Sequence, residues 1–227
     1  MRSAPKPSNE SARLKSLQKY QLLDTISEQI YDDVTKIASE LCGTPVSLIS
    51  LIDENRQWNK STHGSKLKEF ERELSFCAHA ILQPEELFVV SDARNDERFH
   101  DNPLTVGESK VIFYAGMPLV DAEGLPLGAL CVIDNQPRTL PEEKRIALKA
   151  LAKLVQAHFE LRFTNIRLEE SNDRIMLSVP LVDTVLNGID MLTQNDPRLD
   201  QYSQLEMLKD TTTALRTIFE VSEHQEE

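Results

Sequence analysis

The sequence has few cysteines and no long apolar run, and each shortage excludes a class of protein. The three cysteines, Cys42, Cys77 and Cys131, are an odd number without CxxC spacing. This pattern argues against a disulfide framework and against a structural zinc site. No apolar run approaches the roughly 20 residues that a membrane helix needs. The N-terminus also lacks the apolar core of a secretory signal, so we expect a cytoplasmic protein with no membrane partner.

Positive charge is scarce as well. The formal net charge is −12, and residues 166–227 carry 13 acidic and only 5 basic side chains. An acidic surface of this kind repels phosphate backbones, so we do not expect the protein to bind nucleic acid. The acidic end would instead favour solubility or a basic partner.

The residues that are abundant describe a globular protein, because 40% are hydrophobic and 27% are charged. The most apolar part consists of two runs, Val111–Val120 and Leu125–Ile133, on either side of a polar turn. Gly124 in that turn supplies the positive φ of a tight hairpin, which predicts two adjacent antiparallel strands. Gly116 and Gly128 lie inside the runs and indicate a bulge or a close backbone approach, such as a pocket wall.

Shorter elements are predicted before this hairpin. Apolar residues at helical spacing predict two helices, one over about residues 8–23 and one that ends near residue 41. Strands are expected over residues 45–53, 56–61 and 87–92, where β-branched and large apolar residues gather. Residues 76–82 are expected to form one or two helical turns. The charged stretch 66–73 is expected to be a loop, as is 92–107 with one helical turn at most.

The sequence becomes helical from Pro141, which suits the first turn of a helix. Spacings of four and three then alternate in a heptad seam formed by Ala147, Leu151, Leu154, His158, Leu161, Asn165 and Leu168. A second stripe beside it contains Leu148, Ala152, Val155, Phe159 and Ile166. One face of this helix can therefore pack on the sheet while the other packs on a partner helix.

Two further helical stretches are predicted at Ile175–Leu192 and Leu199–Val221. Each has an apolar stripe that a single helical hairpin cannot bury alone. We therefore expect a homodimer through the C-terminal helices, in which two copies form a four-helix bundle. A signalling protein that contacts this bundle is a further candidate partner.

Six segments, in order along the chain, resemble the bacterial GAF domain. They are RLKSLQKYQLLDT, PVSLISLIDENRQW, ELSFCAHAI, VVSDARNDERFHDNP, FYAGMPL and LGALCVIDNQPRTL. The resemblance covers residues 11–163 and leaves residues 1–10 as a flexible leader. It implies an α+β fold with a central antiparallel sheet, helices on one side and a small-molecule cavity on the other. Such domains sense ligands in signalling proteins and rarely catalyse.

Residues 164–227 resemble signalling proteins too. ELRFTNIRLEESNDR is similar to the coiled-coil signalling helix that often follows a GAF domain. IMLSVPL is similar to the motif of the histidine kinase dimerisation and phosphotransfer (DHp) hairpin. Alignment on Pro180 places Ile175 where the phosphoacceptor histidine should be, and isoleucine has no nucleophilic nitrogen. No glycine-rich phosphate loop is present either, so we expect a degenerate hairpin and a protein that is not an enzyme.

The candidate ligand-binding residues are aromatic, thiol and charged side chains on the predicted strands and loops: Trp58, Phe76, Cys77, His79, Asp92, Arg98, Phe99 and Tyr114. Cys77 beside His79 suits a redox-active thiol, a metal ligand or a thioether attachment point, although a cysteine is more often a small buried apolar residue. The acids and arginine of the 92–101 loop also suit a turn-stabilising network. No catalytic residue, metal site or cofactor is evident.

These observations predict a sensory module. A small effector of unknown identity would bind within residues 11–163 and change the helix that begins at Pro141. Two alternatives stay open. One is a thiol-dependent redox enzyme or sensor that uses Cys77, similar to the methionine sulfoxide reductases that share the GAF fold. The other is a scaffold for interaction or dimerisation whose interior holds no ligand.

Overall fold

The structure is a computed structural model that describes residues 1–195, 207 and 209–214. The chain divides into two compact units, Met1–Phe163 and Thr164–Glu227. Across the residues that are described, no helix is both long enough and apolar enough to cross a membrane.

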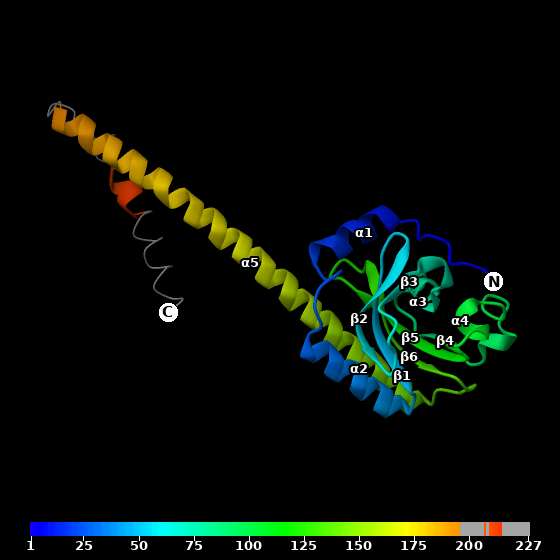
Figure 1. The fold of residues 1–227 in the computed structure, drawn as a ribbon. Helices are drawn as coiled ribbons and strands as arrows, with labels where there is room; N and C mark the ends of the chain where they lie inside the picture. The colour runs from blue at the N-terminus through cyan, green and yellow to red at the C-terminus, as the bar shows by residue number, and fades with distance from the viewer. Residues whose placement is uncertain (196–206, 208, 215–227) are drawn as a thin grey trace. The chain divides into compact units, whose positions relative to one another are not determined.

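A six-stranded antiparallel sheet forms the centre of the first unit, in the order β3-β2-β1-β6-β5-β4 (Figure 1). The strands are β1 (Val46–Ile52), β2 (Arg56–His63), β3 (Glu69–Glu71), β4 (Phe88–Val90), β5 (Phe113–Val120) and β6 (Pro126–Asp134). Helices flank the sheet and a long helix follows it, so the predicted α+β fold class is confirmed. The short edge strand β3 lies in the charged stretch that was expected to be a loop.

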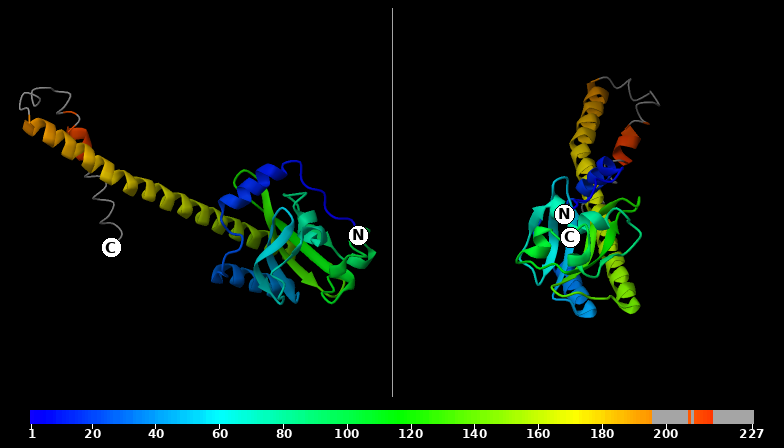
Figure 2. Two further views of the ribbon diagram at one scale, coloured as in Figure 1. Left: turned by 45° about the horizontal axis from the view of Figure 1, so that its top comes forward. Right: turned by 90° about the vertical axis from the view of Figure 1, so that its right-hand side faces the viewer.

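The helices are α1 (Glu10–Lys19), α2 (Gln29–Cys42), α3 (Phe76–Ala80), α4 (Pro103–Val106) and α5 (Glu142–Asn195). Two 3-10 turns, η1 (Arg72–Leu74) and η2 (Ala93–Asn95), complete the elements of the first unit. The views in Figures 1 and 2 place α1 and α2, drawn in blue, on the opposite side of the sheet from α3 and α4.

The sheet is buried on both faces, and each face has a separate hydrophobic core. Helices α1, α2 and the first turns of α5 cover one face with side chains that include Leu17, Val34 and Phe159. Four residues of the predicted second stripe, Leu148, Ala152, Val155 and Phe159, are at most 1% exposed, as predicted for the face of α5 that packs on the sheet, whereas the fifth, Ile166, is half-buried. On the other face, α3 and its neighbouring loops bury a second cluster around Phe76 and Tyr114.

The predicted hairpin is β5–β6, and its turn has the expected chemistry. Gly124 has φ of 81°, and Asp121 Oδ1 accepts hydrogen bonds from the backbone N–H groups of Glu123 and Leu125. The close approach expected at Gly128 is confirmed, because a Cβ there would lie 1.8 Å from the Ser50 carbonyl oxygen on β1. The central pair of strands therefore packs at a distance that only glycine allows.

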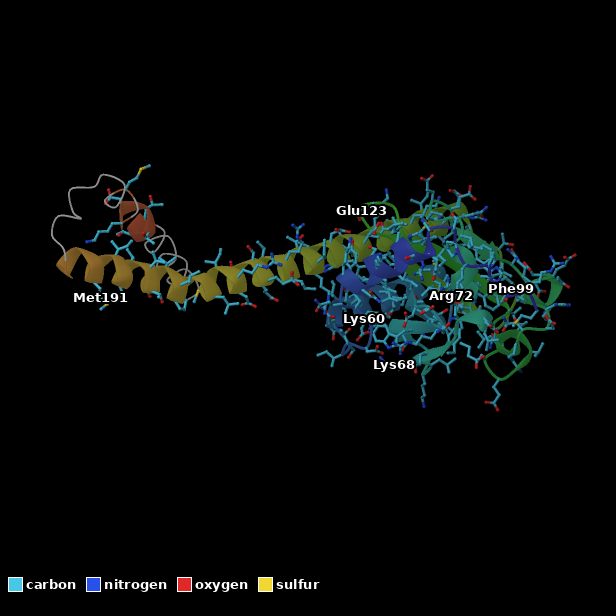
Figure 3. All side chains as sticks on the ribbon, turned by 90° about the horizontal axis from the view of Figure 1, so that it is seen from above. Lys60, Lys68, Arg72, Phe99, Glu123 and Met191 are labelled. Carbon is cyan, nitrogen blue, oxygen red and sulfur yellow. The ribbon has the colours of Figure 1, made fainter. Side chains whose placement is uncertain are left out.

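A β-bulge in β2 changes which side chains face the helices. Ile49 pairs with Ser61 and Ser50 pairs with Asn59, so Lys60 is the extra residue. The Lys60 side chain is fully buried (it is labelled in Figure 3) and donates to Thr25 Oγ1, the Ile26 carbonyl and Glu28 Oε1, the last at 2.5 Å. Lys60 is two residues from Trp58, so the alternation of the strand already points it to the helices, and the bulge brings the next residue, Ser61, to the same side, where its hydroxyl donates to Asp32 Oδ1 at 2.6 Å.

Glu28 joins Lys60 to the long helix. Arg162 of α5 reaches Glu28 Oε1 at 3.2 Å and donates to the carbonyls of Tyr20 and Gln21, each at 3.0 Å. The carboxylate therefore bridges a buried cation on the sheet and a partly exposed cation on α5. A strand, a linker and the helix are held by one charge network.

The long helix departs from the predicted division of the C-terminal region. α5 continues through Ile175 and Pro180 to Asn195 as one element, although proline supplies no backbone N–H. In the stretch predicted at Leu199–Val221, the structure describes only residues 207 and 209–214, which are helical; the rest of that prediction lies outside the described residues. The degenerate phosphotransfer hairpin therefore stays a prediction.

Residues 1–10, expected to be a flexible leader, contact the 96–101 loop. The Arg2 backbone N–H donates to the Arg98 carbonyl at 3.1 Å, and the Met1 ammonium group pairs with Asp101. Helix α1 begins at the end of this segment, and its first residue is Glu10.

Two buried arginines bind the carboxylate of Glu10, and the one on η1 links α1 to the edge of the sheet. Arg13, which is fully buried, binds both carboxylate oxygens at 2.8 Å. Arg72 of η1, labelled in Figure 3, binds the same carboxylate at 2.5 Å and also donates to the Asp53 carbonyl. Burial alone would raise the pKa of Glu10, but the hydrogen bonds from both arginines outweigh it and lower the pKa from 4.5 to about 2.

We expect Glu10→Gln to lower the free energy of unfolding by about 3 kcal/mol or more, because it leaves two buried guanidinium groups without their counter-ion. The lowered pKa means that this stabilisation is complete above about pH 4.5 and is lost as pH falls toward 2. Urea unfolding at neutral and acid pH measures both effects. Glu97→Gln, which removes an exposed pair with Arg2, is the control. Equal stability of the two variants at pH 7 would contradict the prediction.

Candidate functional site

A cavity of about 270 Å³ lies on the sheet face opposite to α1, α2 and α5. Its walls come from five strands, from α3 and α4, and from the loops after β2 and α4. The lining residues are Val46, Leu48, Gln57, Gly64, Ser65, Lys66, Leu67, Phe70, Phe76, Cys77, Leu104, Ser109, Val111, Tyr114 and Ile133. Gly64, Lys66, Leu67 and Ser109 are exposed, so the cavity reaches the surface at this rim.

A buried polar network forms part of the cavity wall. Gln57 accepts a hydrogen bond from Ser75 Oγ at 2.5 Å and donates to Ser50 Oγ and Asn59 Oδ1 at 2.8 and 2.9 Å. Asn59 in turn donates to the carbonyl of Leu67 on the rim, at 2.8 Å. The network fixes the orientation of the Gln57 amide and connects the rim to the sheet.

Ser75 also sets the position of α3. Its hydroxyl oxygen accepts from the backbone N–H of Ala78 at 2.9 Å, which is the N-cap interaction of this short helix. The next two residues, Phe76 and Cys77, are thereby held against the cavity. Phe76 stacks on Phe99, with ring centroids 3.9 Å apart, so a second aromatic ring lies behind this part of the wall.

Two cysteine sulfurs lie together on this side of the sheet, and one of them, that of Cys77, belongs to a residue that lines the cavity. Cys77 Sγ is 3.8 Å from Cys131 Sγ on β6, and Tyr114 Oη on β5 donates to Cys77 Sγ at 3.1 Å. Burial raises the pKa of Cys77, but hydrogen bonds from Cys131, Tyr114 and Ser50 outweigh it and leave the pKa below its usual value. Burial and the neighbouring Cys77 raise the pKa of Cys131. Of the two, Cys77 is therefore the one that ionises first.

Gly116 makes the contact between Tyr114 and Cys77 possible. A Cβ at this position would lie 2.2 Å from Tyr114 Oη, and the two residues are on the same face of β5 because they are two apart. The glycine that the sequence marked as a possible pocket wall thus leaves the space that the tyrosine hydroxyl fills.

The structure brings three of the eight candidate residues to the cavity: Phe76, Cys77 and Tyr114. Phe99 is buried behind Phe76. His79 lies beside Phe99 and its Nε2 donates to the carbonyl of Arg2 at 3.0 Å. Burial lowers the pKa of His79, so the ring is neutral near pH 7.

The other three candidates serve other contacts. Trp58 is buried in the core on the opposite face, because neighbouring residues of a strand point to opposite sides. Asp92 pairs with Arg94 at 2.7 Å, and Arg98 pairs with Asp96 at 2.6 Å while its guanidinium lies over Phe88 and Phe99. These ion pairs are local to the loop.

Most of the polar lining was missed by the sequence reasoning. Lys66, Ser65 and Ser109 lie on loops whose composition indicated only turns, and nothing local distinguishes them. The orientation of Gln57 could have been predicted. It neighbours Trp58 on a strand, so one of the two side chains must face away from the helices. In the part of the chain that the structure describes, no group of three or more His, Cys, Asp or Glu side chains could hold a metal ion.

Comparison with known proteins gives one family match and one curated relative. A family model described as GAF domain matches residues 27–159. The cyclic di-GMP phosphodiesterase PA2567 of Pseudomonas aeruginosa is 41% identical over 167 residues, which are 73% of this chain and 28% of that protein. The chain thus spans less than a third of the length of this relative.

The similar solved structures include two GAF domains at low sequence identity. The PixJ GAF domain of Thermosynechococcus elongatus has a TM-score of 0.49 and 15% identity, covering 70% of this chain and 92% of that one. The GAF domain of an Acinetobacter phosphoenolpyruvate-protein phosphotransferase has a TM-score of 0.47 and 18% identity, covering 67% and 93%.

The relative corrects one expectation. The sequence predicted a protein that is not an enzyme, and a relative with 41% identity is named a phosphodiesterase. The prediction was wrong because its premises concerned kinases alone. A missing phosphate loop and a missing phosphoacceptor histidine argue against phosphoryl transfer from ATP, and they carry no information on the hydrolysis of a cyclic dinucleotide.

The hydrogen bond from Tyr114 can be tested through the reactivity of Cys77. We expect Tyr114→Phe to raise the pKa of the Cys77 thiol and to slow its alkylation by iodoacetamide several-fold at pH 7, because the thiolate loses a donor. The rate profile should move to higher pH, as followed by peptide mass spectrometry. Tyr31→Phe, in the core on the opposite face, is the control, and an unchanged profile in Tyr114→Phe would contradict the assignment.

Proposed function

The chain belongs to the GAF domain family, and on that basis we propose that residues 11–163 sense a small effector held in the cavity between the sheet and α3. The observation that carries this proposal is the cavity itself, about 270 Å³ in volume and open at a rim that contains Lys66. A scaffold whose interior holds no ligand would be expected to fill this space with side chains.

The lining indicates the chemistry of the effector. Apolar groups such as Leu48, Val111 and Ile133 form most of the wall, and polar groups are confined to a few positions. Gln57 is committed to its own network, whereas the Lys66 ammonium group stands at the exposed rim. A compact, mainly apolar molecule with one acidic or polar group fits this arrangement.

Strand β2 offers a route from the cavity to α5. On one face, Gln57 lines the cavity and Asn59 holds the rim at Leu67. Next to them, the alternation of the strand points Lys60 to the other face, where Glu28 connects it to Arg162 of α5. A ligand that moves the rim would change the twist of β2 and thereby the charge network on the helix. A coupling of about 1–3 kcal/mol is typical of such linked sites.

The exposed face of α5 supports a homodimer as the output. Leu154, Leu161 and Leu168 are 45–58% exposed and are spaced by seven residues, and Ile175 and Val182 continue the same spacing. The seam of a coiled coil has apolar residues at two positions of every seven, and this series supplies one of the two. In this assignment Ile175 is a seam residue, which gives an isoleucine a packing role at the position where the DHp-like motif would carry histidine.

The relative suggests what the output controls. A protein named cyclic di-GMP phosphodiesterase contains a region 41% identical to this chain. We extend that activity to this protein as its signalling context, with the cavity acting as the regulatory site. Cyclic di-GMP carries two phosphates and two guanines, which the small apolar cavity does not match, so the effector and the second messenger are different molecules.

The effector site can be tested by filling the cavity. Native mass spectrometry of the freshly purified chain should show a bound small molecule. Leu104→Trp, at a lining position on α4, should abolish that adduct by occupying the space. Val106→Trp places the same side chain on the same short helix at a residue that is 67% exposed, and should retain the adduct. If Leu104→Trp keeps the adduct, or if neither the wild-type chain nor Val106→Trp carries an adduct, the cavity is not the effector site.

The dimer can be tested by placing charge on the seam. We expect Leu161→Asp combined with Leu168→Asp to convert a dimer to a monomer at micromolar concentration, because four carboxylates would face each other in the pair. Light scattering after gel filtration gives the mass. The control is Ile146→Asp, which is 60% exposed and lies outside the seam. If the wild-type chain is a monomer at this concentration, the proposal of a homodimer through α5 is contradicted.

A further inference from the structure

All three cysteines have free thiols and are buried, but their surroundings differ. Cys77 is among the residues that line the cavity, although only 1% of it is exposed. Cys131 does not line the cavity and lies directly behind, with its Sγ 3.8 Å from that of Cys77. Cys42 is in the core on the opposite face, at the end of α2. Only one pair of thiols is therefore placed to react together.

We propose that Cys77 and Cys131 form a peroxide-reactive dithiol, in which a small hydroperoxide that enters the cavity converts the pair to a disulfide. The inference goes beyond effector binding, because it assigns covalent chemistry to a residue that lines the cavity and does not depend on the identity or existence of an effector.

The reaction balances in two steps. The Cys77 sulfur attacks the terminal hydroxyl oxygen of the hydroperoxide ROOH, the O–O bond breaks, and the proton of the Cys77 thiol ends on the leaving alkoxide oxygen, which gives ROH and a sulfenic acid. The Cys131 sulfur then attacks the sulfenic sulfur, and the hydroxyl group leaves with the Cys131 proton as water. The two thiols lose two electrons in total, and the peroxide gains them.

The geometry gives each cysteine a different role. Cys77 faces the cavity and accepts a hydrogen bond from Tyr114 Oη at 3.1 Å, which stabilises the thiolate that attacks. The lowered pKa of Cys77 and the raised pKa of Cys131, described above, agree with this assignment of roles. Cys131 is fully buried and stays a thiol until the sulfenic acid forms beside it.

Closing the bond needs only a small movement. A disulfide has an S–S distance of about 2.05 Å, so the two sulfurs must approach by less than 2 Å from their separation of 3.8 Å. Cys77 is on a helix of five residues that is capped by Ser75, whereas Cys131 is on the central strand β6. The approach therefore displaces α3, which carries Phe76 in the wall of the cavity.

Thiol counting on the full chain tests the proposal without any variant. The protein is treated with hydrogen peroxide at neutral pH, and the remaining thiols are alkylated after denaturation. We expect the count to fall from three to one, with the mass of the intact chain lower by two hydrogens, and with a peptide that links Cys77 to Cys131. Dithiothreitol should restore all three thiols.

Variants separate the roles of the two residues. Cys131→Ser should stop at the sulfenic acid, which dimedone traps on Cys77, and Cys77→Ser should leave Cys131 unmodified. Cys42→Ser is the matched control and should form the disulfide like the wild type. The proposal is overturned if the wild-type chain keeps three thiols, if Cys42 is consumed with either of the others, or if Cys77 is oxidised irreversibly without forming the link.

Discussion

The need to cover both faces of one narrow sheet is the constraint on which the first unit depends. β1 and β6 lie at the centre of the sheet and are buried on both faces. The side chains of each strand alternate between these faces, so each strand needs a covering layer on both sides. One layer is built from long helices that present continuous stripes. The other is built from short turns and loops, which cannot match the pleated surface everywhere. The cavity lies where this second layer leaves the sheet uncovered.

The difference between the two layers also separates their energetics. On the helical side, buried polar groups are tied into ion pairs such as Lys60 with Glu28, which hold elements in a fixed arrangement. On the cavity side, the network around Gln57 is neutral, and every member has a partner. Neutral hydrogen bonds can be rearranged at lower cost than buried ion pairs. The cavity side is therefore the more adaptable one, although both sides share strand β2.

The sequence predicted the parts of this structure that depend on local chemistry. Gly124 between two apolar runs was sufficient to predict the central hairpin, and the periodic residues from Leu148 to Phe159 predicted the face of α5 that packs on the sheet. Of the candidate site, Phe76, Cys77 and Tyr114 were identified by residue type alone. These successes share one cause, since each pattern lies within a single element.

The features that were missed depend on contacts between elements. Trp58 was placed in the cavity because it is aromatic, but the pleat of β2 points it to the helices and gives Gln57 the cavity. β3 pairs with β2 despite its charged side chains, and Lys60 is buried because Glu28 comes from a distant linker. The neighbouring sulfurs of Cys77 and Cys131 come from positions 54 residues apart, and no spacing rule could have joined them.

The absence of a side chain at Gly116 has an evolutionary consequence. The Tyr114 hydroxyl occupies the space that the Cβ of any other residue at position 116 would need. The environment of the Cys77 thiol therefore depends on Gly116, a residue with no side chain to contact it. Glycine and alanine codons differ by a single base. Relatives of this chain could therefore gain or lose a tuned sulfur by one point mutation on β5, while the cysteines themselves stay in place.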